Sequence, residues 1–323
     1  MVFRDRSYSV LLVCGSEKFN NQVKGLLPYN EYYPVRQIGS ISEEAQAASG
    51  KTSLAAQAGT IVVAPLIQTA WGQRSPYNDL CPLLDNTATL SGCVATGCAM
   101  LCKYYSHPAS ASGTYSYIWA KNDSTRRSGS INSTYNYSLM RLTYGTSSTA
   151  SNYGTTAERN EVAKLTADIA NMVEMNFGTS SSGATPGKAV GVMTNTFGYD
   201  RGTRFLRRKF YDDEDWDDIL RGELDAGRPV LYAGWTSEGG GHFFICDGYR
   251  DDGYFHFNYG WNSVGTTYYL SSAVSGNYNS SQEIAVDFQP DKGSTLYGVD
   301  GTIDCDMTAT VKTTCRAARL APS

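Results

Sequence analysis

The sequence predicts an α+β protein with two lobes, a helix-rich lobe followed by a strand-rich lobe. Three segments carry helical periodicity or helix-start signals: 92–105, 157–176 and 214–226. From Pro229 onward, four segments are rich in β-branched and aromatic residues: 229–235, 241–249, 253–261 and 266–272. Helices and strands that are grouped rather than alternating are typical of α+β proteins. The 323 residues are enough to bury a sizeable core.

The first predicted helix, "GCVATGCAMLCKYY" at 92–105, carries small residues on one face. These residues follow the i, i+3, i+4, i+7 spacing and are expected in the core: Ala95, Cys98, Ala99 and Cys102. Cys93 lies about 140° away from Cys98 around the helix, so it can face a cleft. Unpaired N–H groups and the helix dipole at this end favour a thiolate. Cys93 is therefore a candidate nucleophile, although a buried thiol is equally compatible with the spacing.

The other two helices have clear start signals. Thr155 and Glu158 form a capping box before 157–176. The acidic run 212–218 precedes 214–226, where the helix dipole stabilises negative charge. A calcium loop is disfavoured there, because the glycine and glutamate of an EF-hand are missing.

Histidine is scarce, with only His107, His242 and His256 in the chain. His107 is expected to cap a helix end or lie on the surface, and His256 is expected to be structural. His242 follows three glycines, and Asn258 lies on the next predicted strand beyond a "RDDG" turn. The order Cys93, His242, Asn258 is that of papain-like enzymes. In these enzymes an imidazole takes the thiol proton and an amide oxygen orients the imidazole.

Regular pairing would not bring the two residues of this hairpin together. A turn at 251–253 would place His242 opposite residue 262 and Asn258 opposite Cys246. They would then lie about 13 Å apart along the ladder. A direct hydrogen bond therefore requires a bulge, a different register or coiling of the strands.

Composition excludes several other classes of protein. The net charge is −4, and the basic cluster 204–210 is followed at once by acidic residues, so nucleic-acid binding is not expected. No apolar run approaches the roughly 18 residues that span a membrane. The apolar stretch 10–14 is shorter than the core of a secretory signal. The eight cysteines form no CxxC pair, and we expect neither a metal nor an organic cofactor.

Five segments in this order resemble the streptopain family of papain-like bacterial cysteine peptidases. They are "WGQRSPYNDLCP", "GCVATGCAMLCKYYSHP", "ELDAGRPVLYAG", "GGHFFICDGY" and "YFHFNYGW". The resemblance covers about 63–290. It implies a papain-like fold, with the cysteine on the helical lobe and the histidine on an antiparallel β lobe.

The resemblance also implies a role for each matching residue. Cys93 matches the nucleophile, His242 the general base and acid, and Gln73 the glutamine that helps to form the oxyanion hole. Asn258 begins the family's Asn-Trp-Gly-Trp motif and completes the catalytic set. The motif's aromatic residues, which support the site, are Tyr259 and Trp261, where Tyr259 replaces the usual tryptophan.

The residues that flank His242 are expected to contact substrate. They are Gly241 and Phe243, and Phe243 stands where the family usually has alanine. We expect Phe243 to narrow the S2 pocket if its side chain faces the cleft.

The expected function is that of a cysteine endopeptidase acting on proteins or peptides through a thioester acyl-enzyme. One alternative is an inactive papain-like scaffold used for binding or adhesion. The other is a transglutaminase-type enzyme that would use Asp247 or Asp251 with His242. Residues 1–62 are expected to form an N-terminal extension or partial pro-segment that inhibits the enzyme, and 291–323 a tail or the start of a further module. By resemblance, the protein is expected to be a secreted or cell-surface virulence factor made as a zymogen.

Overall fold

The computed structural model describes residues 2–4, 10–12, 38–39 and 59–293. Strands β1 (Val2–Arg4) and β2 (Val10–Leu12) form an antiparallel pair in a unit of their own. All other described elements belong to a second unit. Residues 17–27, whose apolar spacing in the sequence predicts a further helix, lie outside the described residues.

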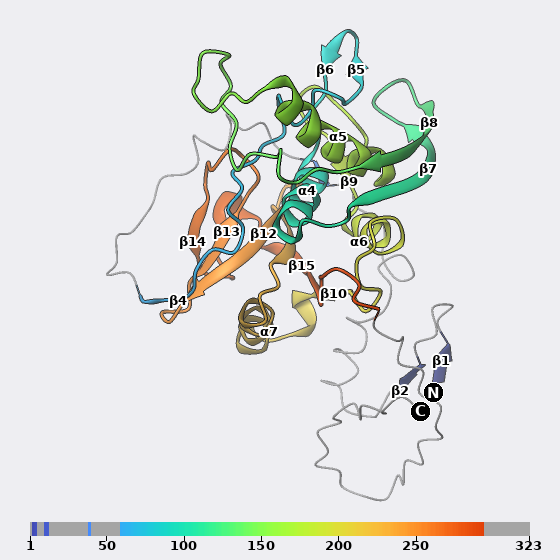
Figure 1. Cartoon of the computed structure of the whole chain (residues 1–323). Coiled ribbons are helices and arrows are strands. Elements are labelled where there is room, and N and C mark those ends of the chain that lie inside the picture. The colour runs from blue at the N-terminus through green and yellow to red at the C-terminus, as the bar shows by residue number, and fades with distance from the viewer. Residues whose placement is uncertain (1, 5–9, 13–37, 40–58, 294–323) are drawn as a thin grey trace, which may run out of the picture. The chain divides into compact units, whose positions relative to one another are not determined.

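A seven-stranded antiparallel sheet forms the β lobe (Figure 1). Six strands follow the order β10-β15-β11-β12-β13-β14, and β4 pairs with the far end of β12. Their bounds are β4 Ile61–Val63, β10 Arg204–Arg207, β11 Val230–Trp235, β12 Gly241–Arg250, β13 Phe255–Asn258, β14 Thr267–Tyr269 and β15 Ser280–Val286. Helix α7 (Asp213–Asp225) lies in this lobe, and the carboxylate of its N-cap residue Asp212 accepts a hydrogen bond from Asp215 N–H, in agreement with the acidic start signal.

The helical lobe contains α4 (Cys93–Tyr105), α5 (Thr156–Met172) and α6 (Pro186–Asn195). It also contains a long hairpin of β7 (Ser110–Trp119) and β8 (Thr125–Thr134). The predicted capping box of α5 is present. Short paired strands complete the unit: β3 Ile38–Gly39 with β9 Gly183–Ala184, and β5 Leu83–Leu84 with β6 Thr87–Ala88. The prediction of a helical lobe that carries Cys93 and an antiparallel β lobe that carries His242 is confirmed.

Helix α4 lies between the other helices of its lobe and the sheet (Figure 1). It contacts α5 and α6 on one side and β12 on the other. Every residue from Cys93 to Cys102 is buried, including the predicted core cysteine Cys98. Small side chains allow this close approach from all sides.

Strand β12 divides its side chains between two hydrophobic cores. Phe243 and Ile245 belong to the core around α4, whereas Phe244 and Cys246 belong to the core of the β lobe. This alternation follows from the pleat of the strand. The ring of Phe243 meets α4 at Gly97, where an added Cβ would lie only 3.1 Å from Cδ1 of Phe243. The glycine therefore lets β12 pack against the first turns of α4.

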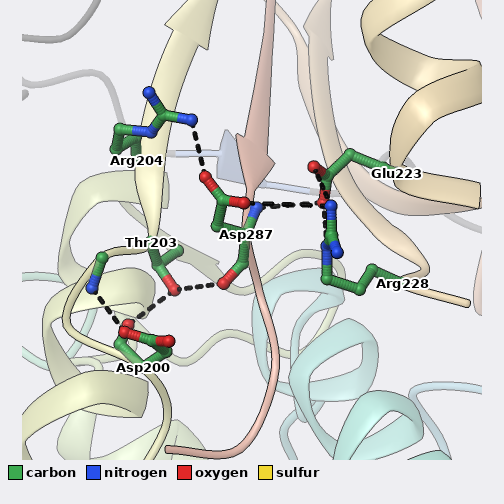
Figure 2. Close-up of polar contacts among 7 residues, drawn as sticks. Asp200, Thr203, Arg204, Glu223, Arg228 and Asp287 are labelled. Atoms are coloured by element: carbon green, nitrogen blue, oxygen red, sulfur yellow. Dashed lines mark hydrogen bonds and ion pairs between the residues drawn. The ribbon is translucent and has the colours of Figure 1, made fainter. Parts of the chain in front are cut away.

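A polar network fastens the edge of the sheet to α7 (Figure 2). The Asp287 N–H donates to the Glu223 carboxylate at 2.9 Å, and Arg204 donates to the Asp287 carboxylate at 2.6 Å. Arg228 donates twice to Glu223, at 2.7 and 2.8 Å. These contacts join the end of β15 to the start of β10 and to the last turn of α7, and so support the β lobe.

We expect Gly97→Leu to lower the free energy of unfolding by about 1–3 kcal/mol, because a larger side chain overpacks the contact with Phe243. Urea denaturation provides the measurement. The matched control is Gly191→Leu in α6, because a Cβ at Gly191 meets nothing within 4 Å. The control should stay within about 1 kcal/mol of wild type or gain stability from helix propensity. Equal losses in the two variants would contradict the packing described here.

Candidate active site

Cys93 is the first residue of α4, and the backbone before it has a conformation that favours glycine. Gly92 is the N-cap with φ 87°. An added Cβ on Gly92 would also lie 2.6 Å from the side chain of Met175. The backbone therefore favours glycine here, and any larger residue would also displace the end of the Met175 side chain. The turn places the thiol at the helix N-terminus, where free N–H groups stabilise negative charge.

The Cys93 thiol lies against the start of β12. Burial raises its pKa to about 12, and hydrogen bonding from the backbone N–H groups of Phe243, Val94 and Cys93 itself acts in the opposite direction. Phe243 directly follows His242 in the strand. The packing of α4 on β12 thus brings the predicted nucleophile to the residue next to the predicted base.

His242 has a defined tautomer. Its Nε2 lies 2.8 Å from the carbonyl oxygen of Tyr259. A carbonyl can only accept, so we assign the ring proton to Nε2. Nδ1 is then the unprotonated nitrogen, and it has no hydrogen-bond partner among the described residues. Burial lowers the pKa of His242 to about 3, with the Tyr259 carbonyl acting in the opposite direction. The imidazole is therefore neutral at pH 7 and has a free lone pair.

Aromatic rings hold the plane of this imidazole. Trp261 stacks on it with centroids 4.3 Å apart, and Phe244 and Tyr259 lie nearly parallel to it at 5.8 and 5.9 Å. The tyrosine hydroxyl is not left unpaired, because it accepts a hydrogen bond from Ser275 N–H at 2.9 Å. Tyr259 and Trp261 thus pack against the imidazole and exclude water from it. Their support of catalysis remains a prediction.

The structure corrects the expected contact of Asn258. Its Nδ2 donates to the Thr69 carbonyl at 2.9 Å, and its Oδ1 accepts from Gly260 N–H at 3.1 Å. The orienting acceptor for His242 is instead the backbone carbonyl of Tyr259. No side-chain pattern in the sequence could have indicated a backbone group.

Register explains the difference. Asn258 pairs with Ile245, three residues along β12 from His242, with a bulge between Cys246 and Gly248. Three residues of strand span about 10 Å. Strand β13 ends at Asn258, and the chain then turns back to bring the next carbonyl to the imidazole.

Gln73 lies at the end of a segment that is fixed to α4. Its side chain is buried, and its backbone carbonyl accepts from Ser91 N–H at 3.1 Å. The Thr96 hydroxyl lies 3.3 Å from the Gly72 carbonyl. Sequence reasoning did not identify Ser91 and Thr96, although hydroxyl residues on both sides of Cys93 were a usable signal. The part of Gln73 in an oxyanion hole remains a prediction.

The flanking residues of His242 occupy different environments. Gly241 begins β12 and pairs with Trp235 of β11. The Phe243 side chain is only 1% exposed and packs on Gly97 between the two lobes. The backbone N–H of Phe243, and not its ring, forms a hydrogen bond with the Cys93 thiol. The effect of either residue on substrate selection remains a prediction.

The remaining histidines make structural contacts. His256 Nδ1 lies 2.6 Å from a carboxylate oxygen of Asp247, and the other oxygen accepts from Ile67 N–H. Asp247 is therefore bonded to His256 and not to His242. Asp251 accepts from Thr60 N–H, so neither aspartate is bonded to His242 as a transglutaminase-type arrangement requires. His107 bonds the Gly198 carbonyl at 3.0 Å on the surface.

The described residues contain no group of three or more His, Cys, Asp or Glu side chains arranged to hold a metal ion. Within the same residues, no helix combines the length and apolar character that a bilayer span requires.

Comparison with known proteins identifies the family. Residues 71–269, more than half of the chain, match the model of the peptidase C10 family. The chain belongs to the peptidase C10 family. It is 32% identical to the thiol protease/hemagglutinin PrtT of Porphyromonas gingivalis over 73% of its own length, and 25% identical to streptopain of Streptococcus pyogenes over 68%. The matches span only 30% of PrtT and 60% of streptopain.

Solved structures show the same fold. The active form of the interpain A cysteine protease of Prevotella intermedia superposes with a TM-score of 0.62 and 30% identity, over 70% of this chain and 94% of interpain A. A prointerpain A fragment superposes with a TM-score of 0.60 and 26% identity, over 84% of this chain and 81% of the fragment. The papain-like α+β fold expected from the sequence is therefore confirmed.

The depressed pKa of His242 predicts a loss of stability in acid. Below pH 6.5 the unfolded chain gains a proton on this residue that the folded chain cannot accept. Between pH 7 and pH 5 the wild type should lose about 2 kcal/mol more unfolding free energy than His242→Gln. Urea unfolding at both pH values measures this difference. His107 and His256 are present in both proteins, so their contributions cancel when the two losses of unfolding free energy are subtracted. Identical losses would show that His242 is solvated and titrates normally.

Proposed function

We propose that this chain is a cysteine endopeptidase in which Cys93 is the nucleophile and His242 the general base and acid. The observation that carries the proposal is the placement of a helix-start thiol at the Phe243 amide, next to an imidazole whose free nitrogen is Nδ1. Membership of a family with thiol protease relatives supports it. None of the contacts described above favours an inactive scaffold.

The reaction follows from the tautomer. Nδ1 of His242 takes the thiol proton, and the sulfur attacks the substrate carbonyl carbon to form a C–S bond. The negative charge that develops on oxygen is stabilised by the Cys93 N–H and the Gln73 side-chain amide. His242 then protonates the leaving nitrogen, the C–N bond breaks and a thioester remains. Water, deprotonated by His242, hydrolyses the thioester and restores the thiol.

Burial sets the protonation state before substrate binds. The high pKa of Cys93 and the low pKa of His242 have the same cause, removal from water. Each charge alone is disfavoured in such a site, but an adjacent thiolate and imidazolium stabilise each other. The resting pair is therefore neutral, and proton transfer accompanies attack on the substrate.

Residues 1–62 act as a pro-segment in this proposal. Strand β3 pairs antiparallel with β9, and its Cα atoms lie within 8 Å of residues in α4 and β12. These are the elements that carry Cys93 and His242. The prointerpain A fragment matches 84% of this chain, against 70% for the active form. Both observations support a segment that lies beside the elements of the active site.

The rest of the chain follows the family in this proposal. Residues 63–290 form the peptidase domain, and 291–323 form a tail or begin a further module. Export to the cell surface or the medium, and a role in virulence, are inferred from the resemblance to streptopain. Protein or peptide chains are the proposed substrates.

Loss of the nucleophile or of the oxyanion donor should have different effects. Cys93→Ala should abolish casein hydrolysis, because no thioester forms. Gln73→Ala should lower kcat by about 100- to 1,000-fold with a small change in KM. Cys98→Ala, in the core of the same helix, is the control and should retain activity. Casein hydrolysis by Cys93→Ala at the wild-type rate would refute the proposed function.

Cleavage within the N-terminal segment should activate the folded chain. A foreign protease site placed between residues 50 and 58 allows the full chain to fold before it is cut. We expect the cut protein to hydrolyse casein faster and to be alkylated faster at Cys93, once the segment has dissociated. The uncut protein and a cut Cys93→Ala variant are the controls. Equal rates before and after cutting would show that residues 1–62 do not occupy the cleft.

A further inference from the structure

We propose that Asn258 is a positioning residue that ties the acceptor for His242 to the segment carrying Gln73. The inference rests on the proposed function and gives Asn258 a role different from a direct contact with the imidazole. Both ends of its side-chain amide are used, and neither reaches His242.

The oxygen end of the amide shapes the turn after β13. Oδ1 accepts from Gly260 N–H, two residues on, which is the bond of an Asx turn. Gly260 adopts φ 66°, a left-handed conformation suited to glycine. Tyr259 lies between these two residues. Its carbonyl is therefore aimed at Nε2 of His242 by a turn that the Asn258 side chain closes.

The nitrogen end reaches the other half of the site. Nδ2 donates to the Thr69 carbonyl, and shortly after the turn Asn262 N–H donates to the Trp71 carbonyl at 3.1 Å. These two bonds fix the chain that leads into Gln73. Hydrogen bonds to Ser91 and Thr96 hold the same chain to the start of α4. The turn at 258–262 and the start of α4 are thus both hydrogen-bonded to the segment 69–73.

Residue 258 needs an amide side chain, because one end must donate a hydrogen bond and the other must accept one. Asn258 is 3% exposed, so a carbonyl or N–H that loses its partner there would be left without water. Aspartate could still accept from Gly260, but it would place a carboxylate oxygen against the Thr69 carbonyl. Alanine would remove both bonds without adding charge.

The substitution Asn258→Asp separates this role from a direct contact. If the side chain accepted the Nε2 proton of His242, a carboxylate would be the stronger acceptor and activity would survive. As a positioning residue, Asn258 needs its donor, so Asn258→Asp should be at least as impaired as Asn258→Ala.

The experiment compares wild type, Asn258→Asp, Asn258→Ala and the control Asn78→Asp. Asn78 is also buried and donates to a backbone carbonyl at 2.7 Å, but that carbonyl belongs to Thr89 and not to Thr69 or the 258–262 turn. Three quantities are measured: kcat and KM on a fluorogenic peptide, the pH profile of Cys93 alkylation by iodoacetamide, and the urea midpoint.

Both Asn258 variants should lose about 100-fold in kcat with KM changed less than about threefold, because small displacements of reacting groups have effects of this size. Their alkylation profiles should also shift relative to wild type. Asn78→Asp should lower the urea midpoint but keep the wild-type kcat and alkylation profile. If Asn258→Asp fails to fold, the uncharged Asn258→Ala decides the outcome.

Wild-type kcat in a folded Asn258→Asp or Asn258→Ala would overturn the inference, as would a kcat loss in Asn78→Asp of the same size. Alkylation requires no peptide hydrolysis. A wild type that cannot cleave peptides but shows the expected alkylation differences would refute the proposed function and leave the positioning role intact.

Discussion

The hydrogen bond from His242 Nε2 to the Tyr259 carbonyl is the interaction on which the site depends. It assigns the ring proton, and so leaves Nδ1 as the free base. A backbone acceptor can neither be protonated nor rotate away, so the tautomer is held by the fold itself. Trp261 stacked on the ring keeps it in one plane. The proposed chemistry requires no other group to choose the tautomer.

The site also requires that the start of α4 in the helical lobe lies against the start of β12 in the β lobe. The thiol stands at the start of α4, and the imidazole stands at the start of β12. Small residues along α4 let β12 approach, and the missing side chain at Gly97 leaves room for the large ring of Phe243. The same contact brings the Phe243 amide to the nucleophile.

Much of the fold could be predicted from sequence, because α4, α5 and α7 carry strong periodicity or caps. The β7–β8 hairpin was missed, because its Ser/Tyr-rich strands lack a clear apolar alternation and are largely exposed. Helix α6 was also missed, although Thr185 as N-cap and Pro186 at the first position signalled it. The contact of Asn258 could not be predicted, because the bulge in β12 and the turn after β13 depend on tertiary packing.

The most direct test of the account is a rapid-quench measurement with a peptidyl p-nitrophenyl ester, followed by intact-mass and peptide mapping. The account predicts a burst of about one equivalent of p-nitrophenol per protein and an acyl group on Cys93, with no burst in Cys93→Ala. Acylation at another residue, or steady hydrolysis without any acyl-protein, would contradict a mechanism in which the Cys93 thiol attacks and His242 Nδ1 carries the proton.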